Sequence, residues 1–212
     1  MIAHDVVGAI AKVGIIPVIT VDDVGDAIPL GGALIAGGLP VLEITLRTEV
    51  GLAAIERLAS RSDAVVGAGT VLDGTQVDAA VEAGARFVVS PGLHDEVVEQ
   101  ARRRGIVALP GIATPTELMA AARLGVDLVK FFPAEASGGV AAVRALSAIM
   151  PRMRFLPTGG IDETSAADYL ALGSVVAVGG SWMAPKHVMS DGDWSAVEDA
   201  ARASRQLTME SP

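Results

Sequence analysis

Residues 124–132 read Leu-Gly-Val-Asp-Leu-Val-Lys-Phe-Phe, and this segment is the most informative one for the architecture. Gly125 ends a helix-like stretch, where glycine supplies the left-handed conformation that closes a helix. The apolar residues that follow do not alternate with polar ones, which is typical of a strand buried on both faces. A helix that passes directly into an interior strand predicts a parallel sheet.

The same pattern recurs along the chain. The apolar bursts that directly follow glycine are 39–44, 85–89, 106–109, 126–129 and 174–178. Three more, at 15–19, 64–66 and 153–156, bring the expected strands to eight. Helix start signals lie between them, the clearest being Thr114-Pro115-Thr116-Glu117, with a capping threonine, proline at the first helical position and glutamate at the third.

Eight strand-helix units that close on themselves form a (β/α)8 TIM barrel, and a helix over residues 3–12 is expected to cap it. The alternative is an open, doubly wound sheet. That fold favours a glycine-rich dinucleotide loop after the first strand, where this chain has Thr20-Val21-Asp22-Asp23.

Length and composition limit the class of protein. The chain has 212 residues, of which 51% are hydrophobic and 19% charged, so we expect one α/β domain over residues 1–212. A net charge of -9 without a basic stripe argues against nucleic acid as a partner, while a small anionic ligand needs only a local site. The longest uncharged run, 27–42, is broken by glycine and proline and is too short for a membrane span.

The residue types also limit the chemistry. The chain has no cysteine and begins without a basic leader, which fits a cytoplasmic protein. Its three histidines, His4, His94 and His187, are isolated and lack metal-ligand spacing. We therefore expect no metal and no cofactor, although a site made of carboxylates alone leaves no recognisable pattern.

Lys130 is the strongest candidate for a catalytic residue in the 124–132 segment, and it is one of only three lysines in the chain. It shares a strand face with Leu128, and Glu43 shares one with Val41, so both are expected to point into the barrel. An amine held away from water and beside a cation such as Arg47 favours its neutral form, as a Schiff-base lysine requires. Glu43 would then be the general acid/base. The alternative is a buried ion pair of these two residues that serves structure alone.

Other candidates lie at the carboxyl ends of the expected strands, where barrels of this class build their sites. Arg47 is suited to hold a carboxylate and Thr70 to donate a hydroxyl, although a surface arginine and a capping threonine are the ordinary alternatives. Gly159-Gly160 and Gly179-Gly180-Ser181 follow the last two expected strands, where such barrels bind phosphate through backbone N–H groups.

With these residues the sequence resembles the 2-keto-3-deoxy-6-phosphogluconate (KDPG) aldolases, a family that includes 4-hydroxy-2-oxoglutarate (KHG) aldolase activity. The likeness runs through nearly the whole chain, in the motifs at 16–19, 43–48, 66–72, 90–92, 109–112, 130–135, 155–160, 179–182 and 192–193. The resemblance implies a metal-independent class I aldolase on a (β/α)8 barrel, usually a homotrimer.

The resemblance also implies roles for single residues. Lys130 would form the Schiff base and Glu43 would be the acid/base. The remaining contacts would come from Arg47 and Thr70 to the pyruvate carboxylate, Gly160 and Ser181 to the phosphate, and Pro91 and Phe132 as walls of the pyruvate pocket. The implied reaction is reversible cleavage of KDPG to pyruvate and glyceraldehyde 3-phosphate, and cleavage of KHG to pyruvate and glyoxylate is the accompanying activity.

Thr158 bears on the substrate, because galactonate-selective family members are expected to carry valine there. Its hydroxyl therefore favours the gluconate epimer, with 2-keto-3-deoxy-6-phosphogalactonate aldolase as the alternative. The chain departs from the family at Pro40, His94 and Leu156, none of which touches the implied chemistry. Two other functions stay open: a sugar-phosphate isomerase or epimerase, which needs no imine, and a binding barrel without turnover.

Overall fold

The computed structural model describes residues 3–210, in which strands and helices alternate. In chain order the elements are α1 (Ala3–Val13), β1 (Ile15–Ile19), η1 (Val24–Asp26), α2 (Ala27–Ala36), β2 (Val41–Thr45), α3 (Gly51–Ala59), β3 (Val65–Gly69), α4 (Gly74–Glu82), β4 (Phe87–Val89), α5 (Asp95–Arg103), β5 (Val107–Leu109), β6 (Gly111–Ile112), α6 (Pro115–Arg123), β7 (Leu128–Phe131), α7 (Gly139–Ile149), β8 (Arg154–Pro157), α8 (Glu163–Leu170), β9 (Val178–Gly180), α9 (Lys186–Ser190) and α10 (Trp194–Glu210).

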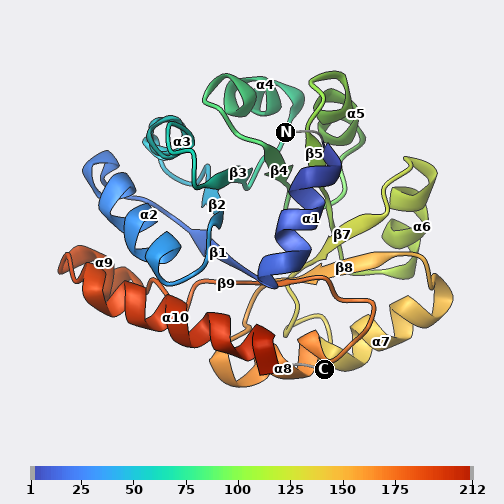
Figure 1. Cartoon of the computed structure of the whole chain (residues 1–212). Helices are drawn as coiled ribbons and strands as arrows, with labels where there is room; N and C mark the ends of the chain where they lie inside the picture. The colour runs from blue at the N-terminus through green and yellow to red at the C-terminus, as the bar shows by residue number, and fades with distance from the viewer. Residues whose placement is uncertain (1–2, 211–212) are drawn as a thin grey trace.

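Every pairing between the strands is parallel. Six strands form a curled sheet in the order β5-β4-β3-β2-β1-β9, and three more form a sheet in the order β6-β7-β8. The predicted parallel α/β order is thereby confirmed. The helices surround the strands in Figure 1.

The two sheets approach each other at both edges. Between β5 and β6 lies only Pro110, which has no N–H to donate to a neighbouring strand. Its carbonyl accepts from the N–H of Lys130 on β7 at 2.9 Å. At the other edge, isolated parallel bridges join Phe155 to Val175 and Thr158 to Gly179.

One expected strand lies later in the chain than the apolar burst indicates. The burst at 174–178 predicts the strand, but β9 begins only at Val178, which pairs with Ile15 of β1. Gly179 and Gly180 therefore lie within the strand rather than in the loop after it. Pairing with β1 explains the shift, because Ile15 is the first residue of β1. A side chain would not fit at position 179, because a Cβ atom on Gly179 would lie 2.4 Å from Oγ1 of Thr158.

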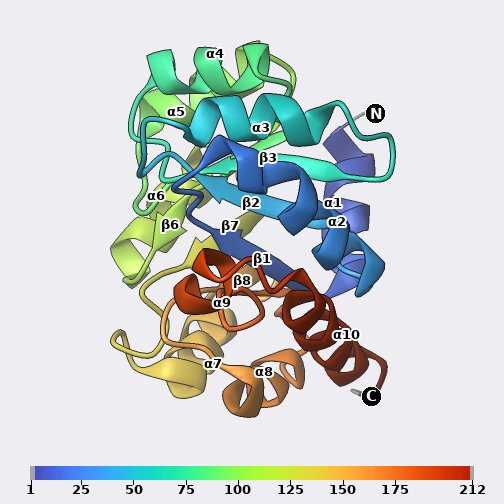
Figure 2. The same ribbon diagram turned by 90° about the vertical axis from the view of Figure 1, so that its left-hand side faces the viewer.

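Helix α1 confirms the expected capping helix. Its Val6 and Ile10 are buried, and it contacts β1, β2 and β5. Gly14, with φ 73°, then turns the chain directly into β1, so α1 lies at the amino ends of the parallel strands. In Figure 2 it lies at the opposite end of the strands from α9, which follows the carboxyl end of β9.

The interior is mainly aliphatic, with Phe87, Phe131, Phe155 and Tyr169 as its largest fully buried side chains. Its aliphatic character follows from a chain that contains only 3% aromatic residues. Among residues 3–210, no helix is both long and apolar enough to cross a membrane.

Candidate active site

The structure brings Lys130 and Glu43 together although 87 positions separate them. β7 carries Lys130 and β2 carries Glu43, and the lysine Nζ donates to Oε1 of Glu43 at 3.3 Å. Their side chains are only 5% and 1% exposed. A charge this deeply buried is costly unless it is paired, so each group compensates the other.

Two neighbours confine this pair. On β3, Gly69 leaves space for the glutamate, because a Cβ atom there would lie 2.3 Å from Oε1 of Glu43. On the other side, the Lys130 Nζ lies 5.1 Å from the centre of the Phe132 ring, which is within the range of a cation–π interaction. The amine therefore has one charged partner and one aromatic wall.

Arg47 and Thr70 lie at the ends of β2 and β3 and are joined to each other. The Nε of Arg47 donates to Oγ1 of Thr70 at 3.1 Å. Thr70 has φ 59°, a left-handed conformation that is rare for a β-branched residue. Strained backbone of this kind gathers at functional sites, and here it turns the Thr70 hydroxyl toward the guanidinium.

A cavity of about 450 Å³ opens at the carboxyl ends of the strands. The predicted site residues that line it are Arg47, Phe132, Thr158, Gly159, Gly160, Gly180 and Ser181. Lys130, Glu43 and Thr70 do not line it themselves. They contact residues of its wall instead: the Lys130 amine lies near the Phe132 ring and Thr70 is bonded to Arg47. Glu43 is connected to this wall through Lys130.

Pro91 is not part of this wall. Its carbonyl packs against Gly111 at the break between β5 and β6, where a Cβ atom on the glycine would lie 2.2 Å from that oxygen. The Pro91 backbone therefore lies against Gly111, the residue of β6 that pairs with Lys130 of β7.

The turn after β8 presents its backbone to the cavity. Gly159 and Gly160 have φ angles of 101° and 81°, which favour glycine. A Cβ atom on Gly160 would also lie 2.8 Å from the Cβ of Glu135. This turn therefore needs two glycines both for its conformation and for its close packing.

Glu135 packs against this turn and is hydrogen-bonded to it. Its N–H donates to the Gly159 carbonyl at 3.0 Å, and its carboxylate accepts from the Tyr169 hydroxyl at 2.5 Å. Burial, together with this hydrogen bond, raises the pKa of Tyr169 and keeps the hydroxyl protonated as a donor. Neither residue was predicted as part of the site: Glu135 belongs to the 130–135 motif, but neither its role nor its contact with Tyr169 can be recognised from the sequence.

Thr158 has an unsatisfied hydroxyl. Its Oγ1 is buried and has no hydrogen-bond partner among the described residues, although the residue lines the cavity. An unpaired buried hydroxyl costs about 1–3 kcal/mol, so a polar group of a ligand would gain by meeting it.

Several cavity residues were not predicted. Among them, Thr20 and Asp22 follow β1, and Lys186 begins α9. Thr20 and Asp22 could have been predicted, because barrels of this class build their sites from the residues that follow each strand. Lys186 gave no such signal, because it begins a short helix five residues after Ser181, away from any strand end. No group of three or more His, Asp or Glu side chains in the described part of the chain is placed to hold a metal ion.

Comparisons with known proteins agree on one family. Residues 6–200 match the family model described as KDPG and KHG aldolase. The chain is 51% identical over 189 residues to a 2-dehydro-3-deoxy-phosphogluconate aldolase of Pseudomonas aeruginosa, covering 89% of this chain and 86% of the relative. It is 45% identical to a KHG/KDPG aldolase of Escherichia coli K12, covering 89% of each chain.

A solved structure shares the fold closely. It is a KDPG aldolase from Legionella pneumophila, with pyruvate captured at low pH as a covalent carbinolamine intermediate. The TM-score is 0.91 at 40% identity, and the match covers 94% of this chain and 97% of the other. A carbinolamine forms when an amine adds to the keto carbon of pyruvate, so that protein carries the chemistry of a nucleophilic amine.

Proposed function

The chain belongs to the KDPG and KHG aldolase family, and from this membership we infer that it is a lyase that cleaves KDPG reversibly to pyruvate and glyceraldehyde 3-phosphate. The observation that carries the assignment is the buried Lys130 amine, which lies 3.3 Å from the Glu43 carboxylate and next to Phe132, a wall residue of a cavity that a glycine turn also lines. An amine, a nearby base and an anion-binding turn are the three parts that the reaction needs.

In the proposed mechanism Lys130 attacks the keto carbon of the substrate. Glu43 lies within hydrogen-bond reach of the amine and can accept the proton that Lys130 must lose first. Glu43 returns this proton to the hydroxyl of the carbinolamine, which leaves as water. The resulting iminium draws electrons from the adjacent C3–C4 bond. Glu43 then removes the proton of the C4 hydroxyl, directly or through a water molecule. The C3–C4 bond breaks, and glyceraldehyde 3-phosphate leaves.

The second half of the reaction returns that proton. The electron pair of the broken bond remains in an enamine on Lys130, and Glu43 protonates its C3 carbon. Hydrolysis of the resulting iminium releases pyruvate and restores the free amine. Burial of Lys130 and Glu43 keeps water from protonating the enamine at random.

The ends of the substrate have separate contacts in this proposal. Arg47 and Thr70 hold the pyruvate carboxylate, and Phe132 covers the keto carbon. The backbone N–H groups of Gly159, Gly160 and Gly180, with Ser181, hold the phosphate. Support comes from their positions in the cavity wall, with Arg47 bonded to Thr70 at one side and the glycine turn over Glu135 at the other.

Thr158 selects the gluconate epimer in this proposal. Its unpaired hydroxyl lines the cavity and would gain a partner from the substrate, most directly the C4 hydroxyl at which the gluconate and galactonate acids differ. Cleavage of KHG to pyruvate and glyoxylate is a second candidate activity, supported by the Escherichia coli relative whose name includes it.

The test is reductive trapping. The protein is incubated with pyruvate and borohydride, which makes a lysine imine permanent, and the adduct is located by intact-mass and peptide analysis. We expect one pyruvate-derived adduct, on Lys130, and none on Lys12 or Lys186. A Lys130→Ala variant should form no adduct and should lose KDPG cleavage. Cleavage at a near wild-type rate by that variant would end the proposal.

We also propose that the two sheets form one closed (β/α)8 barrel within a single domain. In this arrangement β5 and β6 are one strand interrupted at Pro110, and β8 pairs with β9 at the second edge. Support comes from the hydrogen bond of the Pro110 carbonyl with β7 and from the Thr158–Gly179 bridge. The N–H of Val176 donates across this second edge to the Phe155 carbonyl at 3.0 Å. Slow hydrogen exchange at that N–H, comparable with that of central strands, would be expected of a closed barrel.

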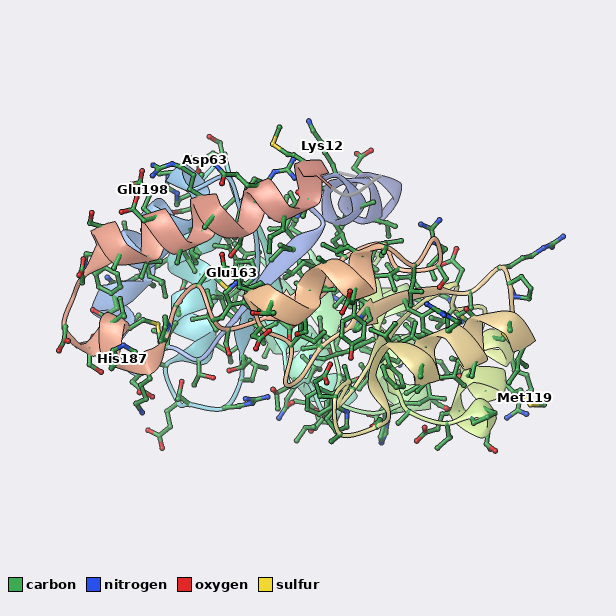
Figure 3. The ribbon with its side chains drawn as sticks, turned by 90° about the horizontal axis from the view of Figure 1, so that it is seen from below. Lys12, Asp63, Met119, Glu163, His187 and Glu198 are labelled. Carbon is green, nitrogen blue, oxygen red and sulfur yellow. The ribbon has the colours of Figure 1, made fainter. Side chains whose placement is uncertain are left out.

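A homotrimer is the assembly that we propose. Several large apolar side chains are exposed on the described chain, among them Leu72, Met119 and Ile149, and contact with another subunit would bury such groups. Met119 points outward from α6 in Figure 3. Sedimentation equilibrium should give three times the chain mass. Because phosphorylated sugar acids are charged and do not cross membranes unaided, we propose the cytoplasm as the place of action.

A further inference from the structure

An ion pair at the cavity has no part in the mechanism above. The Nζ of Lys186 lies 2.7 Å from Oδ2 of Asp22, and both residues line the cavity together with Gly160, Gly180 and Ser181. Asp22 follows β1 and Lys186 begins α9, so the pair joins two segments that are far apart in the sequence.

The pair is poorly explained as a structural clamp. The side chains of Lys186 and Asp22 are 79% and 56% exposed. An exposed ion pair adds little to stability, because water competes for both groups and two mobile side chains must be fixed. A pair this weak opens readily when a better anion arrives, and a phosphate group near neutral pH carries almost twice the charge of a carboxylate.

The charges in the cavity wall are unevenly placed. Arg47 and Lys186 are the lining residues that carry a positive charge. Arg47 is bonded to Thr70, on the side that we assign to the pyruvate carboxylate. Lys186 is five residues from Ser181, and the Ala184 N–H to Ser181 carbonyl bond of 3.1 Å folds the intervening chain back into a turn. It is therefore the lining cation on the phosphate side.

We propose that Lys186 is a specificity-determining residue that binds the substrate phosphate, and that Asp22 is its counter-ion in the empty site. A phosphate dianion replaces Asp22 as the partner of Lys186, whereas a ligand without phosphate leaves the pair intact. The pair thus favours phosphorylated over unphosphorylated keto acids. This inference rests on the proposed function, since it concerns the phosphate end of the same substrate.

The test compares the two surface lysines that the chain offers. Lys12 lies on α1, and Figure 3 shows it well apart from His187, the neighbour of Lys186 on α9. For Lys186→Ala we expect kcat/KM for KDPG to fall about tenfold, the scale of one charge-assisted hydrogen bond, mainly through KM. Lys186→Arg should restore most of the loss, and Lys12→Ala should behave as wild type.

Three further measurements show whether the effect lies at the phosphate end of the site. Inorganic phosphate should inhibit KDPG cleavage competitively, with an inhibition constant about tenfold higher in Lys186→Ala, again the scale of one charge-assisted hydrogen bond. Trapping of the pyruvate imine by borohydride serves as the phosphate-free reference and should keep its half-saturating pyruvate concentration. Asp22→Asn should bind inorganic phosphate more tightly than wild type at low salt, because Lys186 loses its competing partner.

The outcomes separate the two proposals. If wild type forms no imine and does not cleave KDPG, the proposed function fails. If wild type does both, and Lys186→Ala keeps the wild-type KM for KDPG and the wild-type inhibition by phosphate, the role of Lys186 is wrong. Equal losses in phosphate inhibition and pyruvate trapping would also overturn it, because they would indicate a general disturbance of the site.

Discussion

A Cβ atom on Gly69 would lie 2.3 Å from Oε1 of Glu43, far inside van der Waals contact. Gly69 ends β3 and pairs with Thr45 of β2, two residues beyond Glu43. The bare backbone of one strand therefore leaves the space that the carboxylate on its neighbour occupies. The 3.3 Å contact between Glu43 and Lys130 depends on this missing side chain.

Gly69→Ala should accordingly reduce catalysis without touching either reactive group. A methyl group at this place pushes the carboxylate away from Lys130, and a displacement of about 1 Å in a catalytic group costs about 100-fold in rate. We expect kcat for KDPG cleavage to fall on that order. The matched control is Gly173→Ala, since a Cβ atom there meets no heavy atom within 4 Å. Wild-type kcat in Gly69→Ala would contradict this account of how Glu43 is placed.

Thr158→Val should separate stability from specificity. Valine has the shape of threonine and removes the hydroxyl that has no partner among the described residues, so the melting temperature should stay the same or rise. The preference for KDPG over its galactonate epimer should fall about tenfold, the value of one hydrogen bond of about 1.4 kcal/mol. Kinetics with both epimers and thermal unfolding test the two halves. Unchanged discrimination would remove Thr158 from the specificity contacts.

Tyr169→Phe should weaken the support that Glu135 gives to the turn at Gly159 and Gly160. Tyr169 is fully buried, and its hydroxyl is the donor to the Glu135 carboxylate under Gly159 and Gly160. Removing it leaves a charged acceptor short of a partner, at a cost of about 1–3 kcal/mol in the free energy of unfolding. We expect a lower melting temperature and a higher KM for KDPG, with pyruvate trapping much less affected.

The stability that Tyr169 contributes should depend on pH in the alkaline range. Burial and the bond to Glu135 raise the pKa of Tyr169 above the unfolded value of 10.0. The stability that Tyr169 contributes is therefore fully present below about pH 10 and is lost as the pH rises toward the folded pKa. The difference in stability between wild type and Tyr169→Phe should shrink above pH 10. A constant difference across that range would mean that the hydroxyl is not the cause.

Local signals predicted the architecture because each was complete within a few residues. A glycine that ends a helix and the apolar burst after it need no distant partner to be recognised. Those bursts located every strand except β6, the two-residue strand after Pro110, and β9 starts only at the end of its burst, at Val178. Its start is set by pairing with β1, whose first residue Ile15 lies opposite Val178, and this is a contact across the fold.

The residues of the site also fall into those that local sequence predicts and those that only the fold reveals. Lys130 and Glu43 were predictable because a charged side chain inside an apolar strand is costly and therefore informative. Glu135 and Tyr169 were not, since their effect on the glycine turn runs through a contact across 34 positions. Lys186 was not predictable either, because an exposed lysine at the start of a short helix resembles any surface lysine until the fold shows which cavity it lines.

The capping box at the start of α6 was predicted from the sequence and is present, and it yields a prediction about acid stability. The Thr114 hydroxyl accepts from the Glu117 N–H at 3.3 Å. The Glu117 carboxylate accepts from the N–H of Ala113, the N–H of Thr114 and the Thr114 hydroxyl, at 2.8–2.9 Å. Burial alone would raise the pKa of Glu117, but these three hydrogen bonds outweigh it and lower that pKa.

A carboxyl whose folded pKa is lowered contributes stability that is present above its unfolded pKa, and this contribution disappears as the pH falls through the folded pKa. Glu117→Gln should therefore lower the melting temperature at pH 7, and the gap to wild type should close as the pH drops below the ordinary value of 4.5. Thr114→Ala, which removes the cap itself, should cost about 1 kcal/mol. The matched control is Glu99→Gln on α5, whose exposed partner Arg103 lies 3.9 Å away, and its melting temperature should barely change at either pH. A Glu117→Gln gap of equal size at pH 7 and pH 3 would show that the charge of Glu117 is not what stabilises the start of α6.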